Sequence, residues 1–419
     1  MEKVSADAIL RGIRTLVNPA ACAGRFDAVA TTERAAVAFD AGIVTWAGPE
    51  SDLGSCVRMR PGARRIDAAG LTAMPGLVEC HTHAIFEGTR VDDFERRSRG
   101  ETYSDIARKG GGILSTVRAT RTASRLALKN SGRERLSRFL SRGVTTVEIK
   151  SGYGLDTATE LKILATARQL GREHPVTVIT TFLGAHTVPP EFMGGRRGYL
   201  RLVIDEMLPA VARRRLARYC DVFCDETAFS AAEAREILVA AAALGLKAKV
   251  HADQLSAGGG AELAAEVGAV SADHLEHVSD NGVRAMRKAG VTAVLLPAAA
   301  IFIGSQARAP ARKMIDAGLR VAVSTDFNPG SSNTQDLALA GTLACSMLKM
   351  TPAEAFAGIT INAAAALGLE KVCGSVEPGK WGDVTLIDAP DWRDIFYRMG
   401  ENLVRMVIKK GGPTAFFGR

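Results

Sequence analysis

A regular alternation of short apolar runs and Ala/Leu-rich stretches fills the chain from about residue 140 onward. The apolar runs are rich in β-branched residues and end in loops, and helical stretches follow at 157–174, 230–245, 259–268 and 280–290. Together with the apolar segment 71–81, the runs predict strands at 143–150, 176–186, 220–226, 246–251, 269–274, 291–297 and 319–326. About eight strands, each followed by a helix, is the count of a closed (β/α)8 barrel of the TIM type. An open doubly wound sheet is the structural alternative.

Polar residues at the strand ends favour the barrel. Nearly every predicted strand ends in a residue that can ligate a metal or titrate, namely His81 and His83, Lys150, His186, Glu226, His251, His274 and Asp326. In a barrel the carboxyl-terminal ends of all strands surround one mouth, which is where the active sites of this fold lie. An open sheet would spread these residues too far apart.

The two ends of the chain have a different character from the middle. Short alternating runs, such as 33–49 near the N-terminus, are typical of β-hairpins, and residues 372–419 show the same pattern. We therefore predict an α/β protein of two domains. Residues 1–72 and 372–419 would form a small composite β-sandwich, next to a barrel of residues 73–371.

Composition limits the class of partner. The chain is 47% hydrophobic and 23% charged, and it lacks both a membrane-length apolar segment and the pattern of a signal peptide. We therefore expect a cytoplasmic protein without a membrane partner. The net charge of +8 comes from basic residues interspersed with acidic ones, whereas nucleic-acid binding needs a basic patch or stripe. This excess of positive charge favours binding of a small anionic molecule rather than nucleic acid.

His81 and His83 stand two positions apart at the end of the segment 71–81. In a strand such positions point to the same side, so the two imidazoles converge on one point. Imidazole is the commonest metal ligand. With His251 and Asp326 from later strand ends, the site offers three nitrogen ligands and one oxygen ligand, as in a hydrolytic zinc or iron centre. Because histidine ligands must be neutral, metal occupancy is expected to fall below about pH 6.5.

Several motifs carry a resemblance to a known family, and together they cover essentially the whole chain. "PGLVECHTH", "TDFNPGS" and "GSVEPGKWGDVTLID" resemble the amidohydrolase superfamily. "FEGTR", "KSGYGLD", "FLGAHTVPPE", "HADQ" and "DHLEH" are similar to its imidazolonepropionase family, whose enzymes act in histidine degradation. The resemblance implies a metal-dependent hydrolase of a cyclic amide, which opens the ring of 4-imidazolone-5-propanoate to give N-formimidoyl-L-glutamate.

The resemblance also implies roles for individual residues. The metal ligands would be His81, His83, His251 and Asp326, with His274 as the catalytic histidine and Asp326 also transferring a proton. The substrate contacts would be Arg90, Tyr153, His186, Gln254, Asn328, Gly330 and Ser331. Relatives with two metals commonly bridge them with a carboxylated lysine after the fourth strand, where this chain has Glu226. One zinc or iron ion per chain is therefore expected, and a homodimer is the expected assembly.

The chemistry of each side chain limits the role that it can have in this reaction. Gln254 cannot act as a general base, so deprotonation of water would fall to Asp326 and His274. Arg90 can bind the propanoate carboxylate through two parallel hydrogen bonds, and Tyr153 can donate its hydroxyl to the same group. His186 and Gln254 would hydrogen-bond the ring.

Other interpretations are weaker. Another cyclic amidohydrolase or a deaminase of the same superfamily stays open, as does a catalytically silent binding relative, although silent relatives usually lose ligands. Lys150 can equally pair with a structural carboxylate, and Glu226, His174 and His277 are expected outside the catalytic set. Neither glycine run, 110–112 or 258–260, is followed by the residues of a phosphate-binding loop, so nucleotide binding is not predicted.

Overall fold

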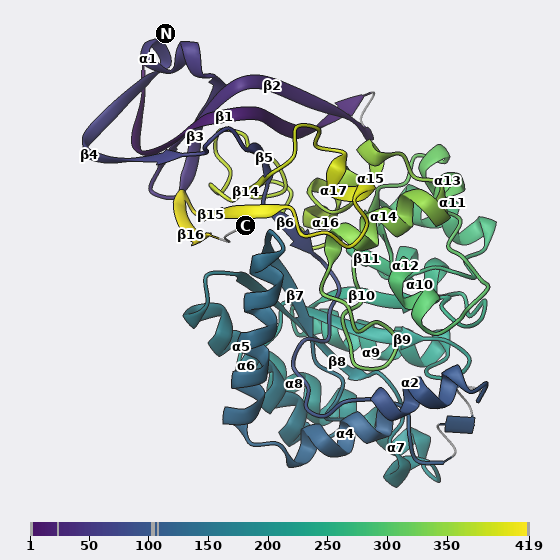
Figure 1. Cartoon of the computed structure of the whole chain (residues 1–419). Helices are drawn as coiled ribbons and strands as arrows, with labels where there is room; N and C mark the ends of the chain where they lie inside the picture. The colour runs from purple at the N-terminus through teal and green to yellow at the C-terminus, as the bar shows by residue number, and fades with distance from the viewer. Residues whose placement is uncertain (1–2, 23–24, 102–104, 107–108, 417–419) are drawn as a thin grey trace.

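The computed structural model describes residues 3–22, 25–101, 105–106 and 109–416. Figure 1 shows a barrel ringed by helices, with a β domain at one end that is built from strands of both ends of the chain. The barrel wall consists of eight parallel strands arranged side by side in their order along the chain. These strands are β6 (Leu77–Glu79), β7 (Val144–Lys150), β8 (Thr177–Ala185), β9 (Tyr219–Cys224), β10 (Lys247–Ala252), β11 (Ser271–His274), β12 (Thr292–Leu295) and β13 (Val321–Val323).

Contacts between the first and last of these strands close the barrel. Thr82 and Phe327 form a parallel bridge just beyond β6 and β13, and the backbone N–H of His83 donates to the Phe327 carbonyl at 2.9 Å. Below this bridge, the Ser324 hydroxyl donates to the buried carboxyl group of Glu79. These contacts confirm the (β/α)8 barrel and exclude the open sheet.

Helices and their caps follow the sequence pattern closely. Asp156 caps α6 by accepting from the Thr159 N–H, and Ser230 and Glu233 form a reciprocal capping box at the start of α9. The helices that follow β7 to β13 are α6 (Thr157–Glu173), α7 (Arg196–Arg201), α8 (Leu208–Arg213), α9 (Ala231–Ala243), α10 (Gly260–Glu266), α11 (Asp280–Ala289), α12 (Pro297–Phe302), α13 (Ala311–Asp316), α14 (Leu337–Leu348), α15 (Pro352–Gly358) and α16 (Ile361–Ala365). The long connection between β6 and β7 contains α2 (Val91–Ser98), α4 (Ile113–Thr122) and α5 (Arg125–Ser141). Single-turn elements are α1 (Leu53–Cys56), α17 (Asp394–Tyr397), η1 (Glu50–Asp52) and η2 (Pro190–Phe192), and η3 (Leu202–Met207) is a short π-helix.

The segment 71–81 is not one strand, and this part of the prediction is wrong. Residues Thr72–Pro75 form β5 in the terminal sheet, whereas β6 begins at Leu77 in the barrel. Gly76 lies at the crossing point, where a Cβ would be 2.3 Å from the Thr145 hydroxyl oxygen. Only glycine allows the backbone so close to β7, and the chain therefore passes from one sheet to the other here.

Both chain ends contribute to a second sheet, as predicted for a small β domain. Its strands are β1 (Val4–Cys22), β2 (Arg25–Asp40), β3 (Ile43–Pro49), β4 (Val57–Asp67), β5, β14 (Val384–Ile387), β15 (Val404–Lys409) and β16 (Gly412–Phe416). The predicted hairpin at 33–49 is the antiparallel pair β2 and β3. Leu10, Phe39, Val384 and Ile408 are buried in the core of this domain. Among the helices of the described residues, none has the length and apolarity needed to cross a bilayer.

Candidate metal and substrate site

A cavity of about 510 Å³ lies at the carboxyl-terminal end of the barrel. It contains all but one of the residues that the sequence predicts for the site, and the remaining one, His81, is fully buried. The predicted residues in its wall are His83, Arg90, Tyr153, His186, His251, Gln254, His274, Asp326, Asn328, Gly330 and Ser331. Ile113, Phe223, Thr227, Leu255 and Ile303 complete the wall.

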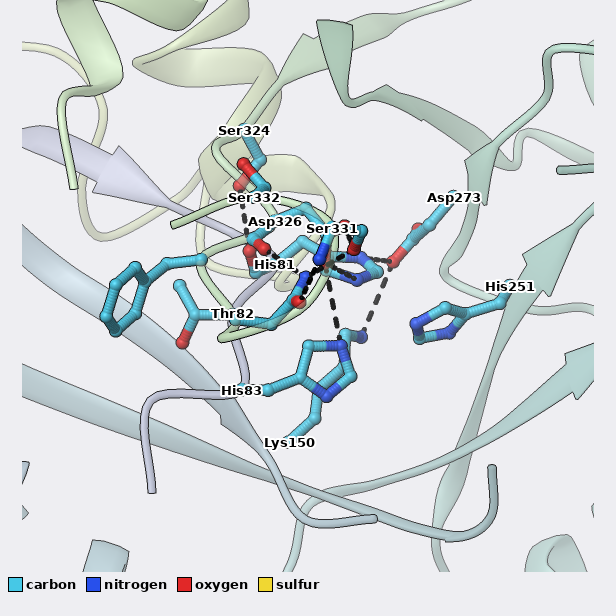
Figure 2. A network of polar contacts seen from close by, with 12 residues as sticks. His81, Thr82, His83, Lys150, His251, Asp273, Ser324, Asp326, Ser331 and Ser332 are labelled. Carbon is cyan, nitrogen blue, oxygen red and sulfur yellow. Dashed lines mark hydrogen bonds and ion pairs between the residues drawn. The ribbon is translucent and has the colours of Figure 1, made fainter. Parts of the chain in front are cut away.

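The four predicted metal ligands converge at the base of this cavity. The Nε2 atoms of His81 and His83 lie 3.5 and 3.6 Å from the same Asp326 oxygen, Oδ1. The ring centroid of His251 is 4.5 Å from that of His81 and 5.6 Å from that of His83. Figure 2 shows these side chains turned toward one another. His251 lies in β10, whereas His81 and His83 follow β6 and Asp326 follows β13, and the closed barrel brings these strand ends together.

Unpartnered nitrogen atoms indicate that this cluster fits a cation. The Nε2 atoms of His81 and His251 are buried, and among the described residues neither has a hydrogen-bond partner. Potential ligand atoms of His81, His83 and Asp326 all lie within 4.8 Å of one another, and the same holds for His81, His251 and His274. Because buried polar atoms without partners are costly, a group that accepts their lone pairs is the natural complement.

Burial governs the charge of the cluster. Burial lowers the pKa of His81 and of His83 well below 6.5, and the positive charge of Lys150 adds to the effect at His81. Burial also raises the pKa of Asp326 to about 7, against the opposing influence of His251. Neutral imidazoles are the form that binds metal, and a cation would favour the ionised form of Asp326.

His186 offers an acceptor to the cavity. Its Nδ1 lies 3.0 Å from the Gly152 carbonyl oxygen, which can only accept, so Nδ1 carries the proton. Burial, followed by the influence of His251, lowers the pKa of His186 to about 3. The ring is therefore neutral, and its Nε2 is the free acceptor.

Arg90 is held against the loop that follows β13. Its side chain is almost fully buried, and its Nε donates to Asp93 Oδ2 at 3.0 Å. A Cβ on Gly330 would lie 2.0 Å from Arg90 Nη1. The missing side chain at Gly330 therefore provides the space in which the guanidinium lies at the cavity wall.

Asn328 organises the loop that carries Asp326. Its Oδ1 accepts from the N–H groups of Gly330 and Ser331, each at 2.8 Å, and its Nδ2 donates to the Asp326 carbonyl at 2.7 Å. The Ser331 hydroxyl then donates to Asp326 Oδ2 at 3.1 Å. The loop thus fixes the carboxylate, while contacts of Asn328, Gly330 and Ser331 with substrate stay a prediction.

His274 and Glu276 form a buried pair that the sequence analysis missed. Glu276 Oε2 lies 3.9 Å from His274 Nδ1, and within the described part of the chain neither atom has a hydrogen-bond partner. Burial lowers the pKa of His274 well below 6.5 and raises that of Glu276 to about 8. Since Nδ1 faces Glu276, Nε2 is the nitrogen that His274 presents to the cavity. The only sequence signal was an acidic residue within "DHLEH".

Backbone geometry supports a specialised role for two of these residues. His274 and Asp326 have φ angles of 81° and 56°, in the left-handed region that side-chain-bearing residues rarely adopt. Such conformations cost of order 1–3 kcal/mol each and occur preferentially at functional sites.

A layer of charged side chains lies beneath the ligands. Asp273 Oδ2 lies 2.6 Å from His81 Nδ1, and Asp221 Oδ2 lies 3.0 Å from His251 Nδ1. Neither aspartate was predicted from the sequence, where the available signal was a charged residue within an otherwise apolar strand. Lys150 pairs with Asp221 in this layer, whereas Glu226 and His277 are exposed.

Comparisons with known proteins identify the family of this chain. The model of the amidohydrolase family matches residues 72–413. The chain is 50% identical to imidazolonepropionase of Geobacillus thermodenitrificans, over 90% of this chain and 89% of that protein. It is 48% identical to imidazolonepropionase of Shouchella clausii, over 91% and 86% of the two chains.

A solved structure shows the same fold at low sequence identity. The adenosine deaminase of Xanthomonas campestris with bound zinc superposes with a TM-score of 0.75 at 18% identity, covering 98% of this chain and 93% of that one. At that identity the likeness concerns the fold alone. The family match and the high identity to curated relatives go further, and the chain belongs to the amidohydrolase family and, within it, to the imidazolonepropionases.

Proposed function

We propose that this protein hydrolyses 4-imidazolone-5-propanoate to N-formimidoyl-L-glutamate, a step of histidine degradation. In this reaction water adds to the ring carbonyl carbon, the adjacent ring C–N bond breaks, and the leaving nitrogen takes up a proton. One observation carries the proposal. The cavity joins a cluster of convergent metal-ligand side chains to a buried arginine, so it suits a substrate with a hydrolysable ring and a carboxylate.

His81, His83, His251 and Asp326 would hold a single zinc or iron ion. When bound, such an ion polarises the carbonyl group and makes water a better nucleophile near neutral pH. Glu226, which follows β9, is exposed, and this arrangement supports one metal rather than a bridged pair.

The substrate would be oriented by the cavity wall. Arg90 would bind the propanoate carboxylate with charge-assisted hydrogen bonds, and the nearby Tyr153 would add its hydroxyl. At the other end, His186 would accept a hydrogen bond from a ring N–H through Nε2. Gln254 can both donate and accept, which suits the mixed polar edge of the ring.

Proton transfer would fall to His274 and Asp326. Gln254 has no titratable group, whereas His274 presents Nε2 to the cavity and Asp326 lies beside the histidine ligands. His274 would take the proton from the attacking water and stabilise the tetrahedral intermediate. Asp326 would pass a proton to the leaving ring nitrogen.

The first test is a direct assay of ring opening. Purified protein is mixed with 4-imidazolone-5-propanoate, the loss of absorbance is followed with and without a chelator, and metal content is measured in parallel. We expect chelator-sensitive loss and about one zinc or iron ion per chain. Metal-loaded protein that leaves this substrate intact would overturn the proposal and direct attention to other cyclic amides and deaminase substrates.

Replacing Arg90 with methionine is expected to raise KM roughly 10- to 100-fold with a smaller change in kcat. The reason is loss of hydrogen bonds to a charged group, worth about 1.5–3 kcal/mol. Steady-state kinetics measure the effect. As a control, an imidazolone analogue with a methyl group in place of the carboxylate should show little difference between Arg90→Met and the natural protein. An equal KM for the true substrate would contradict the role of Arg90.

The protein should keep its metal at a lower pH than a site whose histidine ligands have the ordinary pKa of about 6.5. Burial lowers the pKa of His81 and of His83 well below 6.5, so these rings stay neutral after a free imidazole has been protonated. We therefore expect the midpoint of metal loss to lie below pH 6.5, which refines the expectation from sequence. The measurement is metal content after equilibration and desalting at a series of pH values. Half-loss above this pH would contradict neutral, buried ligands.

Buried carboxyl groups predict a pH dependence of the metal-free protein. Burial raises the pKa of Asp326 to about 7 and those of Glu276 and Glu79 to about 8, whereas the histidines are neutral in both states above pH 6.5, so the folded chain binds more protons there. The free energy of unfolding should therefore decrease as the pH rises from about 6.5 to 8. Thermal unfolding in the presence of a chelator measures the change.

We further propose that the protein acts as a homodimer in the cytoplasm. The support for this assembly is the expectation from the family resemblance, and light scattering on the purified protein tests it.

A further inference from the structure

Five charged side chains are fully buried beneath the candidate metal ligands. They are Glu148 and Lys150 from β7, Asp221 from β9, Lys249 from β10 and Asp273 from β11. Buried charges are costly unless they are paired. Three carboxylates and two ammonium groups here neutralise one another almost completely, and the layer retains one negative charge opposite the place where a cation would bind.

Lys150 lies at the centre of this layer. Its Nζ is 2.7 Å from Asp221 Oδ2, 3.0 Å from Glu148 Oε2 and 3.4 Å from Asp273 Oδ2. An ammonium group has three donors in a compact arrangement, so it can serve three carboxylates at once. Although burial alone would lower the pKa of Lys150, these carboxylates raise it well above 10.5. The side chain is therefore a permanent cation.

Two of these carboxylates also contact the outer nitrogens of two predicted ligands. Asp273 reaches Nδ1 of His81 at 2.6 Å, and Asp221 reaches Nδ1 of His251 at 3.0 Å. Asp221 Oδ1 also accepts from the His251 backbone N–H at 3.1 Å. Figure 2 shows Lys150 below His81 and His83, with dashed lines joining it to Asp273 and Asp273 to His81. One ammonium group thus contacts two carboxylates. Asp273 holds the His81 ring through a hydrogen bond at Nδ1, and Asp221 lies against the His251 ring and holds its backbone N–H.

We infer that Lys150 is a positioning residue for the metal centre, which locks Asp221 and Asp273 so that His251 and His81 aim their Nε2 atoms at one ion. The inference rests on the proposed function in that it assumes a metal at this place. Without Lys150, the carboxylates of Asp221 and Asp273 would repel each other and separate. The Nε2 atoms of His81 and His251 would then no longer point at one position. Outer partners of metal ligands typically affect metal affinity 10- to 100-fold.

Lys150→Met alone would leave three buried carboxylates facing one ammonium group and could unfold the barrel. The test therefore uses Lys150→Met together with Glu148→Gln, which keeps the net charge of the layer unchanged. Glu148 pairs with Lys150 and Lys249 rather than with a ligand histidine. Zinc affinity of the metal-free protein is measured by competition with a chromophoric chelator, and folding is checked by circular dichroism and thermal unfolding.

The matched control is Lys249→Met with Glu148→Gln. Lys249 is just as buried and its removal changes the charge equally, but its Nζ lies 3.8 Å from Asp273 and donates to the Cys80 carbonyl oxygen. We expect the dissociation constant for zinc to rise roughly 10- to 100-fold in the Lys150 variant and to stay near the natural value in the Lys249 variant. At saturating zinc, the kcat of the Lys150 variant should return close to that of the natural protein.

Any one of the following results would overturn the inference. Unchanged zinc affinity in a folded Lys150 variant would do so, as would equal weakening in the Lys249 control. If the natural protein itself binds no zinc or iron, the proposed metal centre fails, and the inference fails with it. Should the Lys150 variant not fold, Asp273→Asn tests the same connection, because Lys150 reaches His81 through Asp273. Unchanged affinity in that variant would also count against the inference.

Discussion

His81→Ala is expected to remove bound metal and hydrolysis together. The His81 ring lies at the centre of the ligand cluster, 3.5 Å from Asp326 and with its centroid 4.5 Å from that of His251. Losing the ion removes several kcal/mol of transition-state stabilisation, so we expect activity to fall roughly 10³-fold or more. Elemental analysis and the ring-opening assay on the same preparation measure both quantities. Asp326→Ala should behave in the same way.

His277→Ala is the matched control for this prediction. His277 is exposed and lies three residues beyond His274 in the chain, so its loss should leave metal content and turnover unchanged. A His81 variant that keeps a full complement of metal would contradict the proposed ligand set. Circular dichroism shows whether the variant retains the fold, so that loss of metal is not confused with unfolding.

His274→Ala is expected to abolish most of the activity while leaving the metal in place. His274 presents Nε2 to the cavity, and loss of a general acid–base group typically costs 10²- to 10⁴-fold in rate. The structure makes this test informative, because the potential ligand atoms of His81, His251 and His274 also lie within 4.8 Å of one another. His274 could therefore serve as a ligand instead of a proton acceptor.

Metal content of the His274 variant separates these two roles. A variant that is inactive but retains its metal supports proton transfer by His274, and a variant that loses both makes His274 a ligand. Retained turnover would refute either role. A kcat/KM profile against pH adds a second criterion, since removal of an essential base should abolish the acidic limb of the curve.

The sequence predicted the barrel because its hydrophobic periodicity is regular from about residue 140 onward. It also identified which residues would meet at the mouth, since the carboxyl-terminal ends of parallel strands in a barrel are forced together. His251 and Asp326 are far apart in the chain, yet their strand-end positions were enough to place them near His81. Arg90 lies on an irregular connection that periodicity does not describe. Its place seven residues past His83 made it a candidate for binding an anion, and the family resemblance implied its contact with the substrate.

Periodicity misread the segment 71–81 because an apolar run does not reveal which sheet it joins. The division at Gly76 depends on the close approach of Thr145, which comes from a strand much later in the chain. Such a contact has no local signature. The placement of β5 in the terminal sheet is therefore a consequence of packing.

The convergence of the predicted ligands, the polar strand ends and a barrel with a small β domain from the chain ends could thus be inferred from residue types and spacing. Only the tertiary structure showed what lies behind the ligands. The sequence allowed Lys150 to pair with a structural carboxylate, but it did not show that three carboxylate partners from three different strands surround this side chain. Likewise, only the structure showed that the Glu276 carboxyl group faces the Nδ1 atom of His274. Burial and distance determine how charged groups interact, and both are properties of the folded chain, since they depend on strands that meet only when the barrel closes.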